Sequence, residues 1–132
     1  MFTEKQLKDA HKKVKTGADF PNYIQEIKAL GLVCYEYFVR DGHTIYYGED
    51  QHQVNSEPIY QGLDIAAKSF IAKLQDAIKI HQQGETDFMT FCTDVAKAGV
   101  EKWIVDTQNM CCTYFDTNGN AMVSEPIPVV EG

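Results

Sequence analysis

The sequence predicts an α+β protein in which a unit of two helices and three antiparallel strands occurs twice. Three observations support this prediction: an internal repeat, apolar stripes of helical period that end at glycine, and strand-like segments joined by tight turns. When the chain is shifted by 68 positions, residues 31–59 align with residues 99–127. The residues that coincide are Gly31 with Gly99, Tyr35 with Trp103, Tyr46 with Tyr114, Tyr47 with Phe115, and the two Ser-Glu-Pro-Ile runs. We therefore interpret residues 1–132 as one domain made of pseudo-repeats 1–61 and 64–132.

The first repeat is expected to begin with two helices. Thr3 and Gln6 form a capping-box pattern, and an apolar stripe follows it up to Gly17. Asp19 is expected to cap the second helix, which Gly31 ends in the left-handed conformation. The buried faces of these two helices are predicted at Leu7, Ala10, His11 and Val14, and at Phe20, Tyr23, Ile24, Ile27 and Leu30.

Three strands are expected to follow. Residues 32–40 are rich in β-branched and aromatic side chains. Asp41 and Gly42 then predict a type I′ hairpin turn, which needs positive φ at both positions. The chain returns over residues 43–48 and forms a third strand over residues 54–60.

The second repeat is predicted to open at Asp64 with a long helix that Gly84 ends. Its apolar stripe comprises Ala67, Phe70, Ile71, Leu74, Ala77, Ile78 and His81. A fourth helix is expected between its cap Asp87 and Gly99, and strands are predicted over residues 100–107, 110–115 and 121–128. Because every strand connection is a short turn, we expect antiparallel pairing. Because each half alone has a thin core, we expect the halves to pack around a pseudo-twofold axis.

The charge balance disfavours nucleic acid as a partner. The chain has 12 Lys and Arg against 19 Asp and Glu, a net charge of −7, and no basic stripe offsets this excess. The first residues lack the apolar core of a secretory signal, and no apolar run reaches the length of a membrane span. We therefore expect a cytoplasmic protein that binds neither nucleic acid nor membrane.

The four cysteines show neither a disulfide framework nor a zinc motif, so reduced thiols, no metal and no cofactor are expected. Cys111 and Cys112 are adjacent on a predicted strand, so their thiols point to opposite faces and do not share one metal in regular geometry. A nucleophilic cysteine needs a neighbouring base, and the sequence pairs no histidine with either thiol. Buried, inert thiols are the favoured interpretation.

His11 and His81 are the first candidate site residues, since both continue apolar helical stripes near the end of the first helix of each half. A symmetric pair near a twofold axis would bind an anion or a metal. Under the structural interpretation, which we favour, each ring is half-buried and bonds locally, for example to the loop at Asp19 or Asp87. In that case the two rings lie apart.

Glu57 and Glu125 are the second candidate pair, because they occupy equivalent places in the two Ser-Glu-Pro-Ile runs. If a twofold axis brings them together in a cleft, a glutamate pair would suit acid–base chemistry. The alternative, which we favour, is that Glu-Pro simply ends a strand.

Tyr35 and Trp103 are the aromatic candidates for a binding surface. Strand alternation places Tyr35 and Tyr37 on one face together with Trp103 and Val105. Tyrosine and tryptophan are enriched at binding surfaces, but the same pattern suits core packing.

Three segments carry a resemblance to a known family: HKKVKTGADFPNYIQEIKALG, HQQGETDFMTFCTDVAKAGVEKWIVD and CTYFDTNGNAMVSEPIP. They resemble the YbcV-like family of bacteria and prophages, which has no known function and whose members are often labelled phage envelope protein. The resemblance extends over nearly the whole chain. It implies a stand-alone domain in enteric bacteria and their prophages, with no catalytic residues to assign.

Two functions from different classes are consistent with these features. The first is a non-catalytic binding or interaction protein, indicated by the tyrosine-rich strands and the absence of a catalytic motif. The alternative is a small enzyme or small-molecule-binding protein with a site between the repeats, indicated by the paired histidines and glutamates. A deep cleft lined by these residues would favour the alternative, and a flat aromatic patch would favour the first. We expect a monomer or a weak dimer.

Overall fold

A computed structural model describes residues 2–14 and 19–127 of the chain. Its helices are α1 (Glu4–His11), α2 (Phe20–Ala29), α3 (Ile71–Gln82) and α4 (Phe88–Lys97). Its strands are β1 (Leu32–Phe38), β2 (Thr44–Gly48), β3 (Gln53–Ser56), β4 (Val100–Asp106), β5 (Cys111–Asp116) and β6 (Ala121–Pro126). The chain thus runs through two helices and three strands twice, which confirms the predicted α+β fold.

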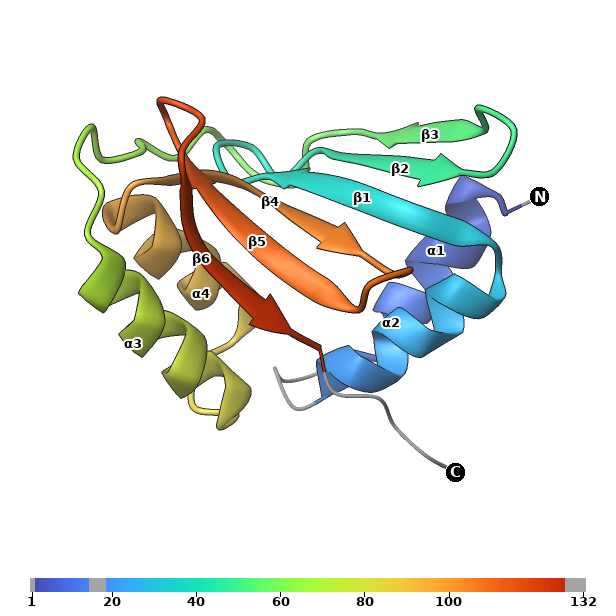
Figure 1. The fold of residues 1–132 in the computed structure, drawn as a ribbon, viewed down its shortest axis with the longest axis horizontal. Helices are drawn as coiled ribbons and strands as arrows, with labels where there is room; N and C mark the ends of the chain where they lie inside the picture. The colour runs from blue at the N-terminus through green and yellow to red at the C-terminus, as the bar shows by residue number, and fades with distance from the viewer. Residues whose placement is uncertain (1, 15–18, 128–132) are drawn as a thin grey trace.

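The strands form one antiparallel sheet in the order β3-β2-β1-β4-β5-β6. The first strands of the two halves, β1 and β4, pair at its centre, so both halves contribute to the same sheet. Both helix pairs lie on one face of the sheet, α1 and α2 toward the β3 end and α3 and α4 toward the β6 end (Figure 1).

The strand register shows the pseudo-twofold axis directly. Across β1 and β4, Glu36 pairs with Ile104, its own equivalent at the offset of 68. Tyr35 pairs with Tyr46 in the first half, just as Trp103 pairs with Tyr114 in the second. The register irregularity of β1 and β2 also recurs at the equivalent place in β4 and β5. The axis therefore passes between Glu36 and Ile104.

The core lies between the sheet and the helices. As the strand alternation predicted, Tyr35 and Tyr37 are buried on the same side as Trp103 and Val105. The helices contribute fully buried side chains to this layer, namely Leu7, Ile24, Ile27, Leu74, Cys92 and Val95. On the helix side, the core is therefore built from all four helices.

The helix boundaries differ from the prediction in two places. Helix α1 ends at His11, before Val14, and Gly17 falls outside the described residues. Helix α3 begins only at Ile71, so Ala67 and Phe70 do not belong to it. The segment before α3 instead runs beside the end of α4. There the backbone N–H groups of Ala66 and Phe70 donate to the carbonyls of Ala96 and Ala98 at the C-terminal end of α4.

The predicted type I′ turn at Asp41-Gly42 is wrong. Only Gly42 has positive φ (+75°), and the connection spans residues 39–43. The carbonyl of Asp41 accepts from the backbone N–H of Ile59, so a distant segment packs on this loop. A side chain at Gly42 would collide with Ile59 and with the Tyr37 hydroxyl. Tertiary packing therefore overrides the local turn preference.

The two aspartates that were predicted to cap helices behave differently. Asp87 accepts a hydrogen bond from the Thr90 backbone N–H at 2.7 Å, as expected for an N-cap. Asp19 occupies the N-cap position of α2 but makes no such capping bond, because its backbone is already in the helical region.

None of the helices in residues 2–14 and 19–127 is long and apolar enough to cross a bilayer.

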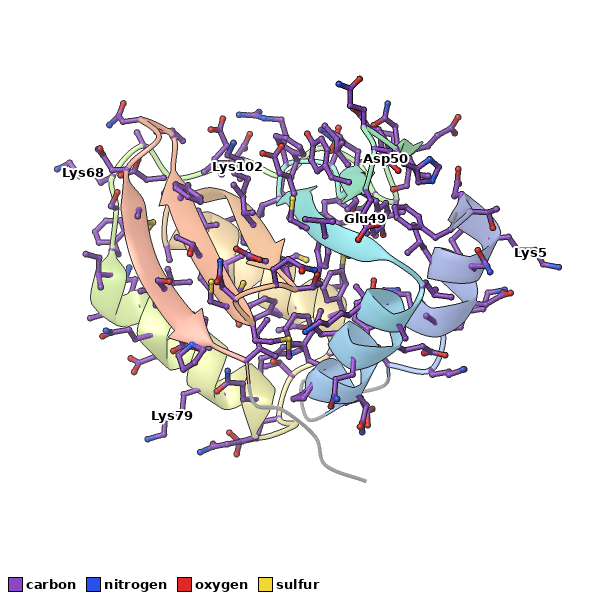
Figure 2. All side chains as sticks on the ribbon, turned by 45° about the vertical axis from the view of Figure 1, so that its right-hand side comes forward. Lys5, Glu49, Asp50, Lys68, Lys79 and Lys102 are labelled. Atoms are coloured by element: carbon purple, nitrogen blue, oxygen red, sulfur yellow. The ribbon has the colours of Figure 1, made fainter. Side chains whose placement is uncertain are left out.

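Lys5, Lys68 and Lys79 lie on different parts of the molecule and extend away from its body (Figure 2).

Candidate functional site

A cavity of about 600 Å³ lies between the helix-covered face of the sheet and the two helix pairs. Helix α1 packs on α2 and helix α3 packs on α4, and the lining side chains come from both pairs. This volume is within the range of small-molecule sites in proteins, about 300–1,000 Å³. We call this cavity the central pocket.

Aromatic side chains form most of its wall. Nine of the 15 aromatic residues of the chain line the pocket: Phe20, Tyr23, Tyr35, Tyr37, Tyr46, Phe88, Phe91, Trp103 and Tyr114. All except Tyr37 fall into pairs at the offset of 68, such as Phe20 with Phe88 and Tyr46 with Tyr114. The sequence repeat therefore gives the pocket a twofold-related lining.

The rings contact one another at the centre of this wall. Trp103 stacks on Tyr37 with ring centroids 4.3 Å apart. The Phe88 ring is nearly perpendicular to both rings, and its centroid lies 5.5 Å from that of Tyr37 and 6.3 Å from that of Trp103. Phe91 and Tyr114 contact Trp103 from two other sides, at 5.6 and 5.8 Å. Such pairs fix ring orientation, so the pocket presents a preformed aromatic surface.

His81 lies on one side of the pocket and bonds locally, as its structural interpretation predicted. Its ring stacks on Phe91 at 4.4 Å, and Nδ1 lies 3.0 Å from the Thr86 carbonyl oxygen. Since a carbonyl only accepts, Nδ1 carries the proton and Nε2 is the free acceptor. Burial lowers the pKa of His81 and outweighs the opposing effects of Thr86 and Asp87, so the ring is neutral at pH 7.

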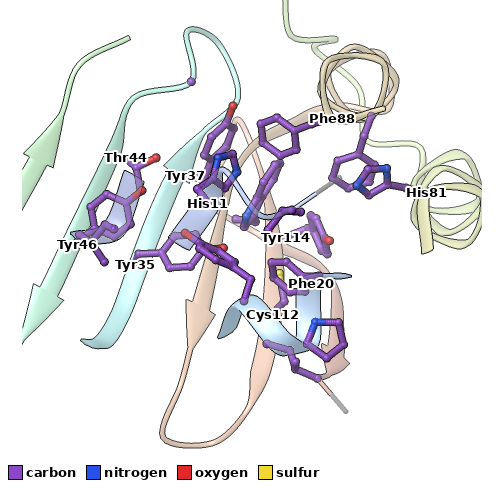
Figure 3. A pocket seen from close by; sticks show the side chains of 18 of the residues that line it. His11, Phe20, Tyr35, Tyr37, Thr44, Tyr46, His81, Phe88, Cys112 and Tyr114 are labelled. Carbon is purple, nitrogen blue, oxygen red and sulfur yellow. The ribbon is translucent and has the colours of Figure 1, made fainter. Parts of the chain in front are cut away.

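His11 also lines the pocket and lies apart from His81 (Figure 3). Its ring meets Tyr23 and Phe88 edge-on at 5.4 and 5.6 Å. Its predicted place on the buried face of the helix is wrong, because the residue as a whole is exposed. Partial burial of the ring against its neighbours nevertheless lowers its pKa. Within the described part of the chain, its ring nitrogens make no hydrogen bond.

The two histidines do not converge, and their positions in the helices are not equivalent. Figure 3 shows the two rings apart. The buried helix positions match at an offset of 67, which aligns Leu7 with Leu74 and places Val14 opposite His81. A shared site that needs both imidazoles on one small ion therefore has no support in this geometry.

The two glutamates differ in position: Glu125 lines the pocket, whereas Glu57 is exposed outside it. The reason is register. Ser56 pairs with Thr44 in the first half, but Glu125 pairs with Cys112, the equivalent of Thr44, in the second. An irregularity between β5 and β6 shifts the register by one residue, and a shift of one residue turns side chains to the other face.

The thiols near the pocket are protonated at neutral pH. Burial raises the pKa of Cys112, which lines the pocket, to about 12 and that of Cys92 to about 11. Cys92 lies 3.5 Å from the Tyr37 hydroxyl, which donates to the Tyr60 hydroxyl at 3.2 Å. Cys112 and Tyr37 are therefore polar, uncharged parts of the wall, and neither thiol is present as a thiolate nucleophile at neutral pH.

Charged groups are few and lie toward the edges of the pocket. Glu4 and Lys8 form an ion pair at 2.7 Å on α1, and Glu125 accepts a hydrogen bond from the Gln82 amide at 3.3 Å. In residues 2–14 and 19–127, no three His, Cys, Asp or Glu side chains are arranged to hold a metal ion.

Residues 8–126 match a family described as a protein of unknown function, DUF1398. The chain belongs to this family. It is also similar to uncharacterized proteins of Mycobacterium bovis and of two strains of Mycobacterium tuberculosis, each 26% identical over 99 residues. These alignments cover 73% of this chain and 59% of each relative, so the chain spans about three fifths of the length of the curated relatives it matches. The DUF1398 match begins within α1 and includes all the later helices and strands of both halves.

The sequence-based candidates Tyr35, Trp103, His11, His81 and Glu125 thus line one pocket, and Glu57 does not. Sequence reasoning did not single out the following lining residues as site candidates: Phe20, Tyr23, Tyr37, Tyr46, Phe88, Phe91, Cys112 and Tyr114. The signal that identifies most of them is an aromatic residue at both positions of the 68-residue offset.

Proposed function

We propose that this protein binds a small, mainly apolar or aromatic molecule in the central pocket. The observation that carries the proposal is the cavity of about 600 Å³ whose wall contains nine aromatic side chains from both halves. This is the alternative function considered from the sequence. The aromatic surface expected of an interaction protein is instead turned inward, since Tyr35 and Trp103 are only 5% and 4% exposed.

Binding, rather than nucleophilic catalysis, is the function that the wall chemistry supports. The buried thiols are protonated and the buried phenols of Tyr35 and Tyr114 have pKa values well above the usual range. Neither kind of group is therefore available as a thiolate or phenolate nucleophile at pH 7. The hydroxyls and imidazoles are therefore suited to orient a ligand by hydrogen bonds.

We expect a single folded unit that acts as a monomer or weak dimer in the cytoplasm, without nucleic acid or membrane as partner. A prophage origin is part of the proposal because of the sequence resemblance. The DUF1398 family description names no function and no origin.

Trp103 makes the proposal testable, since it is the only tryptophan and it lines the pocket. The probe is 1-N-phenylnaphthylamine, an uncharged dye whose fluorescence rises in apolar surroundings and which accepts energy from tryptophan. We expect saturable dye binding at one site, with energy transfer from Trp103. Dye that does not bind, or that binds without energy transfer, would contradict the proposal.

Two variants of β3 supply the matched comparison. Ser56 lines the pocket, and its neighbour Asn55 is exposed on the same strand with its side chain on the other face. Ser56→Phe should fill part of the pocket and lower dye affinity at least about tenfold, the equivalent of 1.4 kcal/mol. Asn55→Phe should leave dye affinity unchanged. Equal effects of the two substitutions would count against the central pocket as the site.

A further inference from the structure

Glu125 is a charged group in the pocket without a counter-ion. Its only polar contact in the described chain is with the Gln82 side-chain amide at 3.3 Å, and none of the ion pairs there includes it. Glu4, the other carboxylate of the lining, is neutralised by Lys8 at 2.7 Å. Glu125 is therefore the one lining carboxylate of the described chain that is left to pair with a bound molecule.

The surroundings of Glu125 are aromatic. It lies opposite Cys112 on β5 and next to Tyr114; burial raises the pKa of both groups, and the charge of Glu125 raises it further. Tyr114 in turn contacts Trp103, which stacks on Tyr37. A carboxylate beside a cluster of aromatic rings is an arrangement that binds organic cations, because the rings and the carboxylate both attract positive charge.

An anionic ligand fits this pocket less well. The ammonium group of Lys8 is already paired with Glu4, and burial lowers the pKa of both His11 and His81, so these rings carry no charge at pH 7. An anion would also meet the unpaired charge of Glu125. The net charge of −7 of the whole chain further favours the approach of cations.

We infer that the ligand of the central pocket is an organic cation with an aromatic or apolar body, an ammonium compound whose charge is held by Glu125 and whose body lies on Trp103, Tyr37 and Tyr114. This inference rests on the proposed function and adds the chemical class of the ligand. The register shift in β6 is what supplies the charge, since the equivalent Glu57 in the first half is outside the pocket.

The test uses three compounds that share a naphthalene ring and differ in charge: the cation naphthalen-1-ylmethylammonium, the neutral naphthalen-1-ylmethanol and the anion naphthalene-1-carboxylate. Their affinities for the whole chain are measured by isothermal titration calorimetry at pH 7 and fixed ionic strength. We expect the ammonium to bind at least about tenfold more tightly than the alcohol, as for a charge-assisted hydrogen bond, and the carboxylate to bind most weakly.

Glu125→Gln and Glu57→Gln provide the matched variants, because both remove one negative charge but only Glu125 lines the pocket. Glu125→Gln should reduce ammonium affinity to that of the alcohol and leave alcohol affinity unchanged. Glu57→Gln should keep the preference for the ammonium. Equal binding of all three compounds, or a preference that survives Glu125→Gln, would overturn the inference while leaving the proposed function intact. Failure of all three compounds to bind would overturn both.

Discussion

The third strands of the two halves, β3 and β6, end in the same Ser-Glu-Pro-Ile sequence but place different side chains in the pocket. Ser56 lies opposite Thr44 in the first half, and Glu125 lies opposite Cys112 in the second. The repeat thus determines the aromatic lining of the cavity. A shift of one residue in the strand register brings Glu125 into the lining and so determines its charge. A duplicated fold has acquired an asymmetric site through backbone geometry rather than through a new residue type.

The glycines that follow α2 and α4 show a second asymmetry. Gly31 and Gly99 both have positive φ, +104° and +95°, and both follow a helix. The segment that precedes α3 crosses Gly99, so a Cβ there would collide with the Lys68 backbone, whereas a Cβ at Gly31 would meet open space. The connection between the halves therefore packs on the second half.

The largest expected effect separates these two glycines. Gly31→Ala should cost about 1–2 kcal/mol of unfolding free energy, because alanine is strained at positive φ. Gly99→Ala should cost about 1–3 kcal/mol more than that, because the methyl group overpacks against the backbone. Urea denaturation measures both values. Equal losses would show that the segment around Lys68 does not pack on Gly99.

A smaller effect is expected where the halves differ by one hydroxyl group. Thr107 is fully buried, and its hydroxyl lies 2.6 Å from the Leu32 carbonyl oxygen. Its equivalent at the offset of 68 is Val39, also fully buried. Thr107→Val should cost about 1–3 kcal/mol, because the carbonyl loses a buried partner.

The reverse substitution, Val39→Thr, tests whether the pseudo-twofold symmetry extends to these positions. The Val39 N–H donates to the Glu101 carbonyl just as the Thr107 N–H donates to the Val33 carbonyl. A threonine at position 39 should therefore find an equivalent carbonyl and cost less than about 1 kcal/mol. A loss as large as that of Thr107→Val would contradict the symmetry of the backbone here.

The smallest expected effect concerns the pH dependence that His11 and His81 contribute. Both pKa values are lowered in the folded state from 6.5, so the unfolded chain takes up these protons first. Their contribution to stability is complete above pH 6.5 and is lost as the pH falls below it. Four aspartates also have lowered pKa values, but they change the stability only at lower pH, below their usual pKa of 3.8: Asp41, Asp87, Asp106 and Asp116.

The double variant His11→Asn/His81→Asn checks this assignment, and the asparagine amide introduced at position 81 can still reach the place of Nδ1. Its unfolding free energy should change less than that of the wild type between pH 6.5 and about pH 5, as measured by urea denaturation. An unchanged slope would show that other groups cause the acid sensitivity in this range.

The fold class was predictable from sequence because its signals are local or repeated. The helix-ending glycines, the strand alternation that buries Tyr35 with Trp103, and the 68-residue offset all reflect short-range geometry. The α3 boundary was missed because the apolar period of Ala67 and Phe70 continues that of the helix, while their segment bonds to the end of α4.

The site was only partly predictable for the same reason. The paired aromatic residues indicate a twofold-related surface, but the sequence does not distinguish a filled core from a cavity. The separation of Glu57 from Glu125 depends on how β5 pairs with β6, and identical tetrapeptides carry no information about that register.

The central claim is that both halves enclose one ligand, and the indole N–H of Trp103 tests it most directly. It is the only indole in the chain, so it gives a single side-chain resonance in a ¹H–¹⁵N spectrum. Titration with naphthalen-1-ylmethanol should shift this resonance together with the amides of Tyr35 and Tyr46 in the first half and Tyr114 in the second. Shifts confined to one half, or to the opposite sheet face around Tyr47 and Phe115, would contradict the claim.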